Sequence, residues 1–101
     1  MKLAFISGPY RSGTRRGIVD NIRAAEEVAI RYWQKGYAVF CPHMNTALFD
    51  GLCDDETWLK GDIEILKRFD VIVMMKTWML SSGAGDELDI AQDAGLEVIY
   101  D

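Results

Sequence analysis

The sequence has little of several residue types, and each shortage narrows the classes of protein that it can belong to. Its 101 residues include only two cysteines, Cys41 and Cys53, which are too few for a disulfide framework. No run of eighteen apolar residues is present, and the residues after Met1 do not form a cleavable signal pattern. We therefore expect a soluble, cytoplasmic protein whose two thiols are reduced and packed in the core.

Histidine is equally scarce, because His43 is the only one in the chain. Cys41, His43 and Cys53 would be the natural zinc ligands, but they lack the CxxC or HxxxH spacing that is typical of zinc sites. We expect neither a metal nor a cofactor.

Basic residues are also fewer than acidic ones. The chain has eleven Lys and Arg residues and sixteen Asp and Glu residues, which gives a net charge of −5. A surface that binds nucleic acid or an anionic membrane needs a basic stripe, so we expect neither partner. Arg11, Arg15 and Arg16 nevertheless lie in a stretch without acids between Met1 and Val19. This locally cationic loop suits a small anion better than a polymer.

The hydrophobic pattern alternates between strand-like and helical segments across one domain, residues 1–101. Short apolar runs indicate strands, and apolar residues at helical spacing separate them. The strands are expected at residues 3–7, 37–41, 70–75 and 97–100, and the helices at 19–35, 55–69 and 86–95. This order predicts an α/β fold in three layers, with a four- to five-stranded parallel sheet covered on both faces. Three loops, 8–17, 42–54 and 76–85, should meet at the carboxyl ends of the strands, where such sheets bind ligands.

Two acidic residues fall on helix faces that are otherwise apolar. On a helical wheel Glu87 lies among Leu88, Ala91 and other apolar residues, and Asp62 lies at the centre of the apolar stripe of the preceding helix. Glu87 would occupy the first turn of its helix, where the macrodipole favours the ionised form. An ionised, partly desolvated carboxylate is a candidate nucleophile. The alternatives are a helix-capping acid for Glu87 and a core acid satisfied by neighbouring donors for Asp62.

Glycine and serine cluster in two of the expected loops. Ser81, Gly83 and Gly85 come directly before the last helix, in an arrangement that lets backbone N–H groups approach an anion. The loop that begins at Gly8 includes Arg11, the first choice for a phosphate or carboxylate contact. Glycines also occur in ordinary tight turns, so neither loop alone indicates a binding site. The fold is expected to bring the two loops together, which strengthens the prediction that both contact a ligand.

Aromatic residues and the single histidine extend the list of candidates. His43 should point into the crevice, as a hydrogen-bonded structural group or as an acid or base. Tyr10 could stack on a base or pack on its loop, and Trp58 is expected in the core. Trp78 could cover a ligand or belong to an interface. With Tyr32 and Trp33, these aromatics exceed what one small core can hide, which predicts a homo-oligomer.

Four segments of the sequence together resemble a known family. They are FISGPYRSG, VFCPH, DIEILKRFDVIVMM and SSGAGDELDIAQDAGLEVI, and they cover nearly the whole chain. They look like the nucleoside 2-deoxyribosyltransferase superfamily, which includes the 2'-deoxynucleoside 5'-phosphate N-hydrolases. The combined pattern is fairly specific, whereas each segment alone is not.

The resemblance implies a flavodoxin-like domain that acts on a small-molecule nucleoside or nucleotide. Glu87 would attack C1' of the sugar and form a covalent glycosyl-enzyme, while Asp62 assists the base or the sugar. The sugar would pass to another base or to water, an alternative that the sequence leaves open. The expected substrate-binding residues, from the loops and the resemblance together, are Gly8, Tyr10, Arg11, Ser12, His43, Ser81, Gly83 and Gly85.

Two other functions remain open from the sequence. A phosphoribohydrolase of the lysine-decarboxylase-like type also places a Glu after a Gly-rich loop, but its GGxGT pattern is not matched by SSGAGDE. A nucleotide-sensing module would keep the pocket without turnover. Asp86, next to Glu87, would repel an anionic substrate unless it points to solvent, as the helical wheel indicates.

Overall fold

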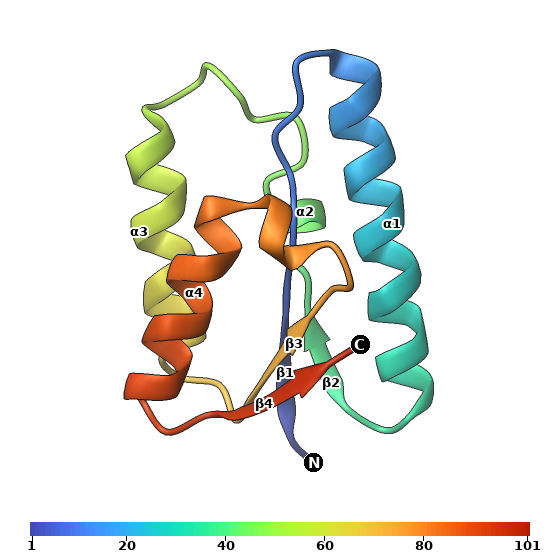
Figure 1. Cartoon of the computed structure of the whole chain (residues 1–101), viewed down its shortest axis with the longest axis vertical. Coiled ribbons are helices and arrows are strands. Elements are labelled where there is room, and N and C mark those ends of the chain that lie inside the picture. The colour runs from blue at the N-terminus through green and yellow to red at the C-terminus, as the bar shows by residue number, and fades with distance from the viewer.

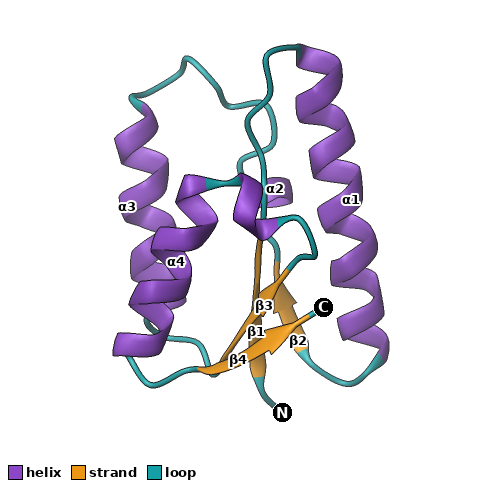
Figure 2. Ribbon diagram, viewed as in Figure 1, coloured by secondary structure: helices purple, strands orange, loops and turns teal.

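The computed structural model describes residues 1–101 and contains one parallel sheet (Figure 2). The strand order is β2-β1-β3-β4, and every neighbouring pair is parallel. This confirms the α/β class and the parallel sheet, with four strands. The strands are β1 (Leu3–Ser7), β2 (Ala38–Phe40), β3 (Val71–Met74) and β4 (Glu97–Tyr100).

Helices cover both faces of the sheet, which confirms the three layers. Figure 1 shows α1 on one side of the strands and α3 and α4 on the other. No helix is long and apolar enough to cross a membrane. The helical elements are α1 (Arg15–Gln34), the short α2 (Pro42–Asn45), α3 (Asp55–Leu66), the 3₁₀ turn η1 (Trp78–Leu80) and α4 (Ser82–Asp93).

The last helix begins earlier than the sequence pattern indicated, because a serine caps it. Ser81 Oγ accepts a hydrogen bond from the backbone N–H of Ala84 at 3.1 Å, which satisfies one of the free amides of the first turn. The expectation of a loop up to Gly85 was therefore wrong, since Gly83 and Gly85 lie inside α4. In consequence Glu87 lies in the second turn of the helix rather than the first.

Helix α1 also begins early, at Arg15 rather than Val19. Thr14 caps it by accepting a hydrogen bond from the backbone N–H of Gly17 at 3.0 Å. The segment expected as a loop after β2 contains α2, which has Pro42 at its first turn, a position that tolerates proline because no N–H is needed there.

Strand β1 divides its side chains between two separate cores. Ala4 and Ile6 belong to the cluster beneath α1, whereas Phe5 belongs to the cluster beneath α3 and α4. Successive side chains of a strand point to opposite faces, so Ser7 lies on the same face as Phe5. All four residues are fully buried. The end of β1 thus places the hydroxyl group of Ser7 on the α4 side of the sheet.

The two cysteines lie in different surroundings. Cys41 is buried against the α1 face of the sheet, as expected, and its burial raises the pKa of the thiol to about 11. Cys53 is exposed, so the expectation that it packs in the core was wrong. It belongs to a segment between α2 and α3 that has no strand or long helix to bury it.

The aromatic residues that led to the prediction of an oligomer also differ in exposure. Tyr32 is buried in the core, whereas Trp33 is 54% exposed. Trp78 is half-buried beside Tyr100, with 6.3 Å between the ring centroids. The homo-oligomer stays a prediction, supported on the surface by Trp33.

Candidate active site

A cavity of about 300 Å³ lies at the carboxyl ends of β1 and β2. Residues that follow β1, residues from α2 and the segment after it, α3, and the start of α4 line it together. The three loops that were expected to meet at this edge of the sheet do contribute to one cavity. Both acids from the apolar helix faces, Glu87 and Asp62, are among the lining residues.

Glu87 is half-buried, and one of its carboxylate oxygens is held by the protein. Ser7 Oγ donates a hydrogen bond to Oε1 of Glu87 at 2.7 Å. The pKa of Glu87 is raised to about 7, chiefly by burial; the Ser7 hydrogen bond lowers it, and the nearby charges of Asp62 and Asp86 contribute smaller increases. The expectation that the first turn of the helix favours the ionised form does not hold, because Glu87 lies in the second turn and loss of solvation raises its pKa. Near neutral pH both protonation states are populated.

Asp62 faces the cavity from α3 without a partner in the protein. No side chain or backbone N–H donates to it, so the alternative of a core acid satisfied by neighbouring donors does not hold. Burial raises the pKa of its carboxyl group to about 6. Two acids with raised pKa values thus share one cavity, a feature that is frequent in active sites.

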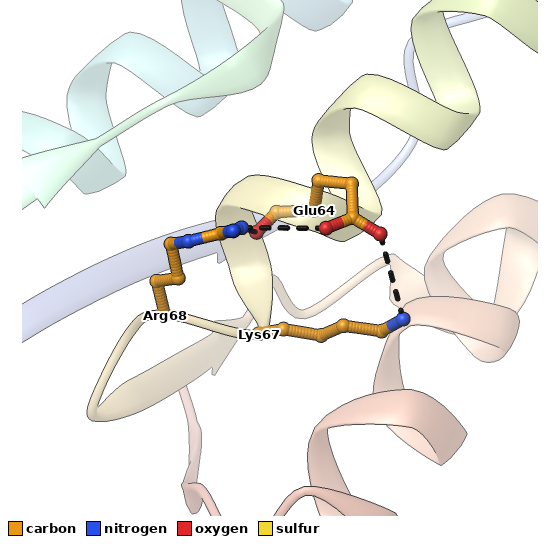
Figure 3. A network of polar contacts seen from close by, with 3 residues as sticks. All are labelled: Glu64, Lys67 and Arg68. Carbon is orange, nitrogen blue, oxygen red and sulfur yellow. Dashed lines mark hydrogen bonds and ion pairs between the residues drawn. The ribbon is translucent and has the colours of Figure 1, made fainter.

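Glu64, another acid of α3, differs from Asp62 because cationic side chains lie beside it. Glu64 lies 3.7 Å from Lys67 Nζ and 3.3 Å from Arg68 Nη1, as Figure 3 shows. Arg68 also donates to the carbonyl oxygen of Glu64 at 2.7 Å. Such an exposed acid with cationic neighbours is an ordinary surface group. Asp62, two residues earlier, has no cation beside it.

Arg11 lines the cavity but is already paired. Its Nη1 atom lies 3.0 Å from Asp55 Oδ2, and both side chains are more than half exposed. Asp55 begins α3 and also pairs with Arg11. An anionic ligand that binds Arg11 has to compete with this carboxylate.

Tyr10 joins two of the loops at the cavity. Its hydroxyl group donates to Asp50 Oδ1 at 2.7 Å and accepts from the backbone N–H of Leu48 at 3.0 Å. The hydroxyl is thereby occupied, while the ring remains part of the lining. Asp50 was not singled out from the sequence, because nothing in the local pattern relates it to Tyr10, forty residues earlier.

His43 is buried and bonded to the protein, which favours the structural role. Its Nε2 atom lies 3.1 Å from the carbonyl oxygen of Gly8 and 3.0 Å from that of Pro9, so Nε2 carries the proton and donates. Nδ1 lies 3.8 Å from the sulfur of Cys41. Burial lowers the pKa of the imidazole, which keeps it neutral. His43 holds the loop after β1 in place.

Two of the expected binding residues are explained by packing. Gly8 lines the cavity, and a Cβ atom on it would clash with the side chain of Met75, so glycine is required where the ends of β1 and β3 meet. Ser12 does not line the cavity. Its hydroxyl accepts from the N–H of Thr14 at 3.4 Å and lies where a side chain on Gly17 would be.

Ser81 and the two glycines at the start of α4 also differ in whether they line the cavity. Ser81 lines the cavity, although its hydroxyl is used as the helix cap. Gly83 also lines the cavity, and a Cβ atom there would meet nothing closer than 3.8 Å. Gly85 lies outside the cavity. Glycine is therefore not needed at position 83 for packing.

Two residues at the site differ from the expectations. Trp58 was expected in the core, and Ser7 was not among the candidates. Trp58 is half-buried and lines the cavity, with its Nε1 atom buried and without a hydrogen-bond partner. It is not a plain core residue. Ser7 was missed, although a polar residue at the end of an otherwise apolar strand is a signal that could have found it.

The fold and the cavity define a parallel α/β domain with a pair of acidic residues at the carboxyl edge of its sheet. The family described as a domain of unknown function, DUF4406, matches residues 5–100. The chain belongs to this family. None of the curated proteins matches the sequence.

Proposed function

We propose that the protein cleaves the N-glycosidic bond of a nucleoside or nucleoside 5'-monophosphate, through a covalent glycosyl intermediate on Glu87. The observation that carries this proposal is the cavity itself, where Glu87 is half-buried, is held at one oxygen by Ser7, and faces the same space as Asp62. The resemblance of the sequence to the nucleoside 2-deoxyribosyltransferase superfamily supports the same chemistry.

The reaction uses the two acids in different roles. In its ionised form Glu87 attacks C1' of the sugar, the bond between C1' and the base nitrogen breaks, and the electron pair leaves with the base. Asp62, in its protonated form, gives the base a proton. Water or a second base then attacks C1', the bond from C1' to the Glu87 oxygen breaks, and Asp62, now ionised, accepts the proton of the attacking group. The pKa of Glu87 is raised to about 7 and that of Asp62 to about 6, so near neutral pH a minor fraction of the protein carries the reactive combination of ionised Glu87 and protonated Asp62.

The charges that line the cavity bear on the choice between nucleoside and nucleotide. Its only cationic side chain is Arg11, against five carboxylates, and Arg11 is paired with Asp55. A 5'-phosphate would enter an acidic cavity and would need Arg11 to leave Asp55. An uncharged 5'-hydroxyl meets no such cost, so nucleosides and their monophosphates have to be compared as matched pairs.

The test is to incubate the protein with such pairs, with and without a free acceptor base, and to measure base release and base exchange by chromatography. We expect release or exchange by the wild type and a loss of at least about 10³-fold in Glu87→Gln, because the amide is not a nucleophile. Cys41→Ala, which alters a buried group outside the cavity, is the control and should keep its activity.

Three results would count against the proposal in different ways. No base release by the wild type across the panel contradicts the reaction itself. Release that persists in Glu87→Gln contradicts the role of Glu87. Tight nucleotide binding that is equal in wild type and Glu87→Gln, without any product, indicates a sensing module in place of an enzyme.

A further inference from the structure

Ser7 is a fully buried polar residue at the end of an interior strand. It ends the central strand β1, lies opposite Met74 in the parallel register, and has no solvent exposure. Its carbonyl oxygen accepts a hydrogen bond from the N–H of Met75 at 2.9 Å. The backbone of Ser7 is therefore held by the sheet, which fixes the point from which its hydroxyl reaches Glu87.

The contact with Glu87 has a defined direction. An ionised carboxylate can only accept hydrogen bonds, so the hydroxyl of Ser7 donates to Oε1 at 2.7 Å. No other donor contacts the carboxylate, and Oε2 has no partner in the protein. One oxygen is thus immobilised and the other is free.

We propose that Ser7 is a positioning residue, which holds Oε1 of Glu87 against the end of β1 and leaves Oε2 as the oxygen that attacks C1'. This inference rests on the proposed function. It assigns a task to a residue that does not itself line the cavity. A carboxylate on α4 whose Oε1 is bonded to the sheet, rather than free to rotate, keeps its attacking oxygen in reach of the sugar.

The same hydrogen bond sets the balance between the two protonation states. Burial, Asp62 and Asp86 all favour the neutral acid, and Ser7 is the group that favours the carboxylate. Removing the hydroxyl should therefore raise the pKa of Glu87 and reduce the fraction of enzyme with an active nucleophile at neutral pH. A serine that only filled space would have neither effect.

The test compares Ser7→Ala with Thr14→Ala. Thr14 provides a matched control, because its hydroxyl also makes a local hydrogen bond, at the start of α1, and it does not line the cavity. Each variant is titrated by NMR of the Glu87 side-chain carboxyl carbon, and kcat and KM are measured against pH with the best nucleoside.

In Ser7→Ala we expect the pKa of Glu87 to rise by roughly one unit. Asp62 has the lower pKa and must stay protonated, so the acid limb of the kcat profile should stay in place while the alkaline limb moves to higher pH. We expect the maximal kcat to fall on the order of tenfold to a hundredfold, with little change in KM, because positioning and the ionised nucleophile rather than binding are lost. In Thr14→Ala both quantities should remain those of the wild type. Ser7→Cys, which keeps the size but donates more weakly, should shift both in the same direction by a smaller amount.

The failures of the two proposals can be told apart. An active wild type whose Ser7→Ala and Ser7→Cys variants show an unchanged pKa of Glu87 and an unchanged pH profile overturns the role of Ser7 alone. A fall in kcat that Thr14→Ala reproduces also overturns it, since loss of stability would then explain both. A wild type that releases no base overturns the proposed function, and the positioning role with it, whatever the titration shows.

Discussion

Burial has opposite consequences for the ionisable groups on the two faces of the sheet at neutral pH. On the α1 face burial raises the pKa of Cys41 to about 11, so the thiol stays protonated and unreactive at neutral pH. On the α4 face burial raises the pKa of Glu87 to about 7, which places its titration at neutral pH. The physical cause is the same loss of solvation. The outcome differs because a thiol starts near the alkaline range and a carboxylate starts well below neutrality.

The faces also differ in what surrounds these groups. The α1 face is a closed apolar cluster with Ile6 and Val73 at its centre. The α4 face has an apolar base that includes Phe5 and Met74 and then opens into the cavity at the end of β1. Strand alternation alone sends Ile6 to one side and Ser7 to the other. Both faces contain a core cluster, and only the α4 face also contains the two acids that line the cavity.

The largest expected effect is a loss of stability from a substitution on the α1 face, which should leave the acids on the α4 face unchanged. Ile6→Ala should lower the free energy of unfolding by about 2–5 kcal/mol, because it leaves a cavity in a closed core. In the fraction that remains folded, the pKa of Glu87 should not change. Denaturant unfolding gives the first quantity and carboxyl NMR the second. A shifted pKa in Ile6→Ala would show that the two faces are coupled.

Glu87→Gln should make the protein more stable at alkaline pH, by about 1–3 kcal/mol at pH 8, allowing for partial solvent screening of the carboxylate. The folded-state pKa of Glu87 is raised, so its stabilising contribution is complete below the unfolded pKa and is lost as the pH rises to about 7. The uncharged amide avoids this loss. The gain should therefore fade towards pH 4, which denaturant unfolding at several pH values will check.

Cys41→Ala offers the comparison for that measurement. Its thiol is protonated in both the folded and the unfolded protein below pH 8, so any change in stability should be independent of pH from 4 to 8. If Glu87→Gln also shows a pH-independent change, Glu87 is not desolvated in the way that the structure indicates.

Asp55→Asn should shift substrate preference by several-fold towards the 5'-monophosphate. The substitution removes one acid from the cavity and frees the guanidinium of Arg11, 3.0 Å away. The ratio of kcat/KM for a matched nucleoside and monophosphate is the measurement. Asp54→Asn, which removes a charge beside the cavity without touching Arg11, is the control; an equal shift in both would mean that net charge alone decides.

The smallest effect concerns two glycines of one helix. Gly83→Ala and Gly85→Ala should each stabilise the protein by up to about 1 kcal/mol, because neither added Cβ atom meets an obstacle. Only Gly83 lines the cavity. Thermal unfolding should therefore show similar gains, while KM for the nucleoside rises in Gly83→Ala alone. Equal KM values in the two variants would place the ligand away from the start of α4.

The sequence predicted most of the fold, because it depends on local patterns. Apolar strands and amphipathic helices have their own periodicities, and the parallel order follows from their alternation. The starts of α1 and α4 were misplaced because each depends on a single hydrogen bond from a backbone N–H to the side chain of Thr14 or Ser81. Cys53 was misplaced because the segment around it has no pattern that indicates burial or exposure.

The candidate site was predictable in its acids but not in its contacts. Helical wheels brought Glu87 and Asp62 to inward faces, and both line the cavity. The protonation of Glu87 depends on neighbours from other elements, which no wheel contains. The Arg11 pair with Asp55 likewise joins residues that are far apart in the sequence. Tertiary contacts of this kind require the structure.

The most direct test of the central claim is to capture the intermediate on Glu87. A 2-deoxy-2-fluoro nucleoside slows the release of the sugar, because fluorine destabilises the positive charge that develops at C1'. After a short incubation and proteolysis, mass spectrometry should find the fluorinated sugar on the peptide that contains Glu87, and on no peptide of Glu87→Gln. Base release without this adduct, or an adduct on a different residue, would contradict the account.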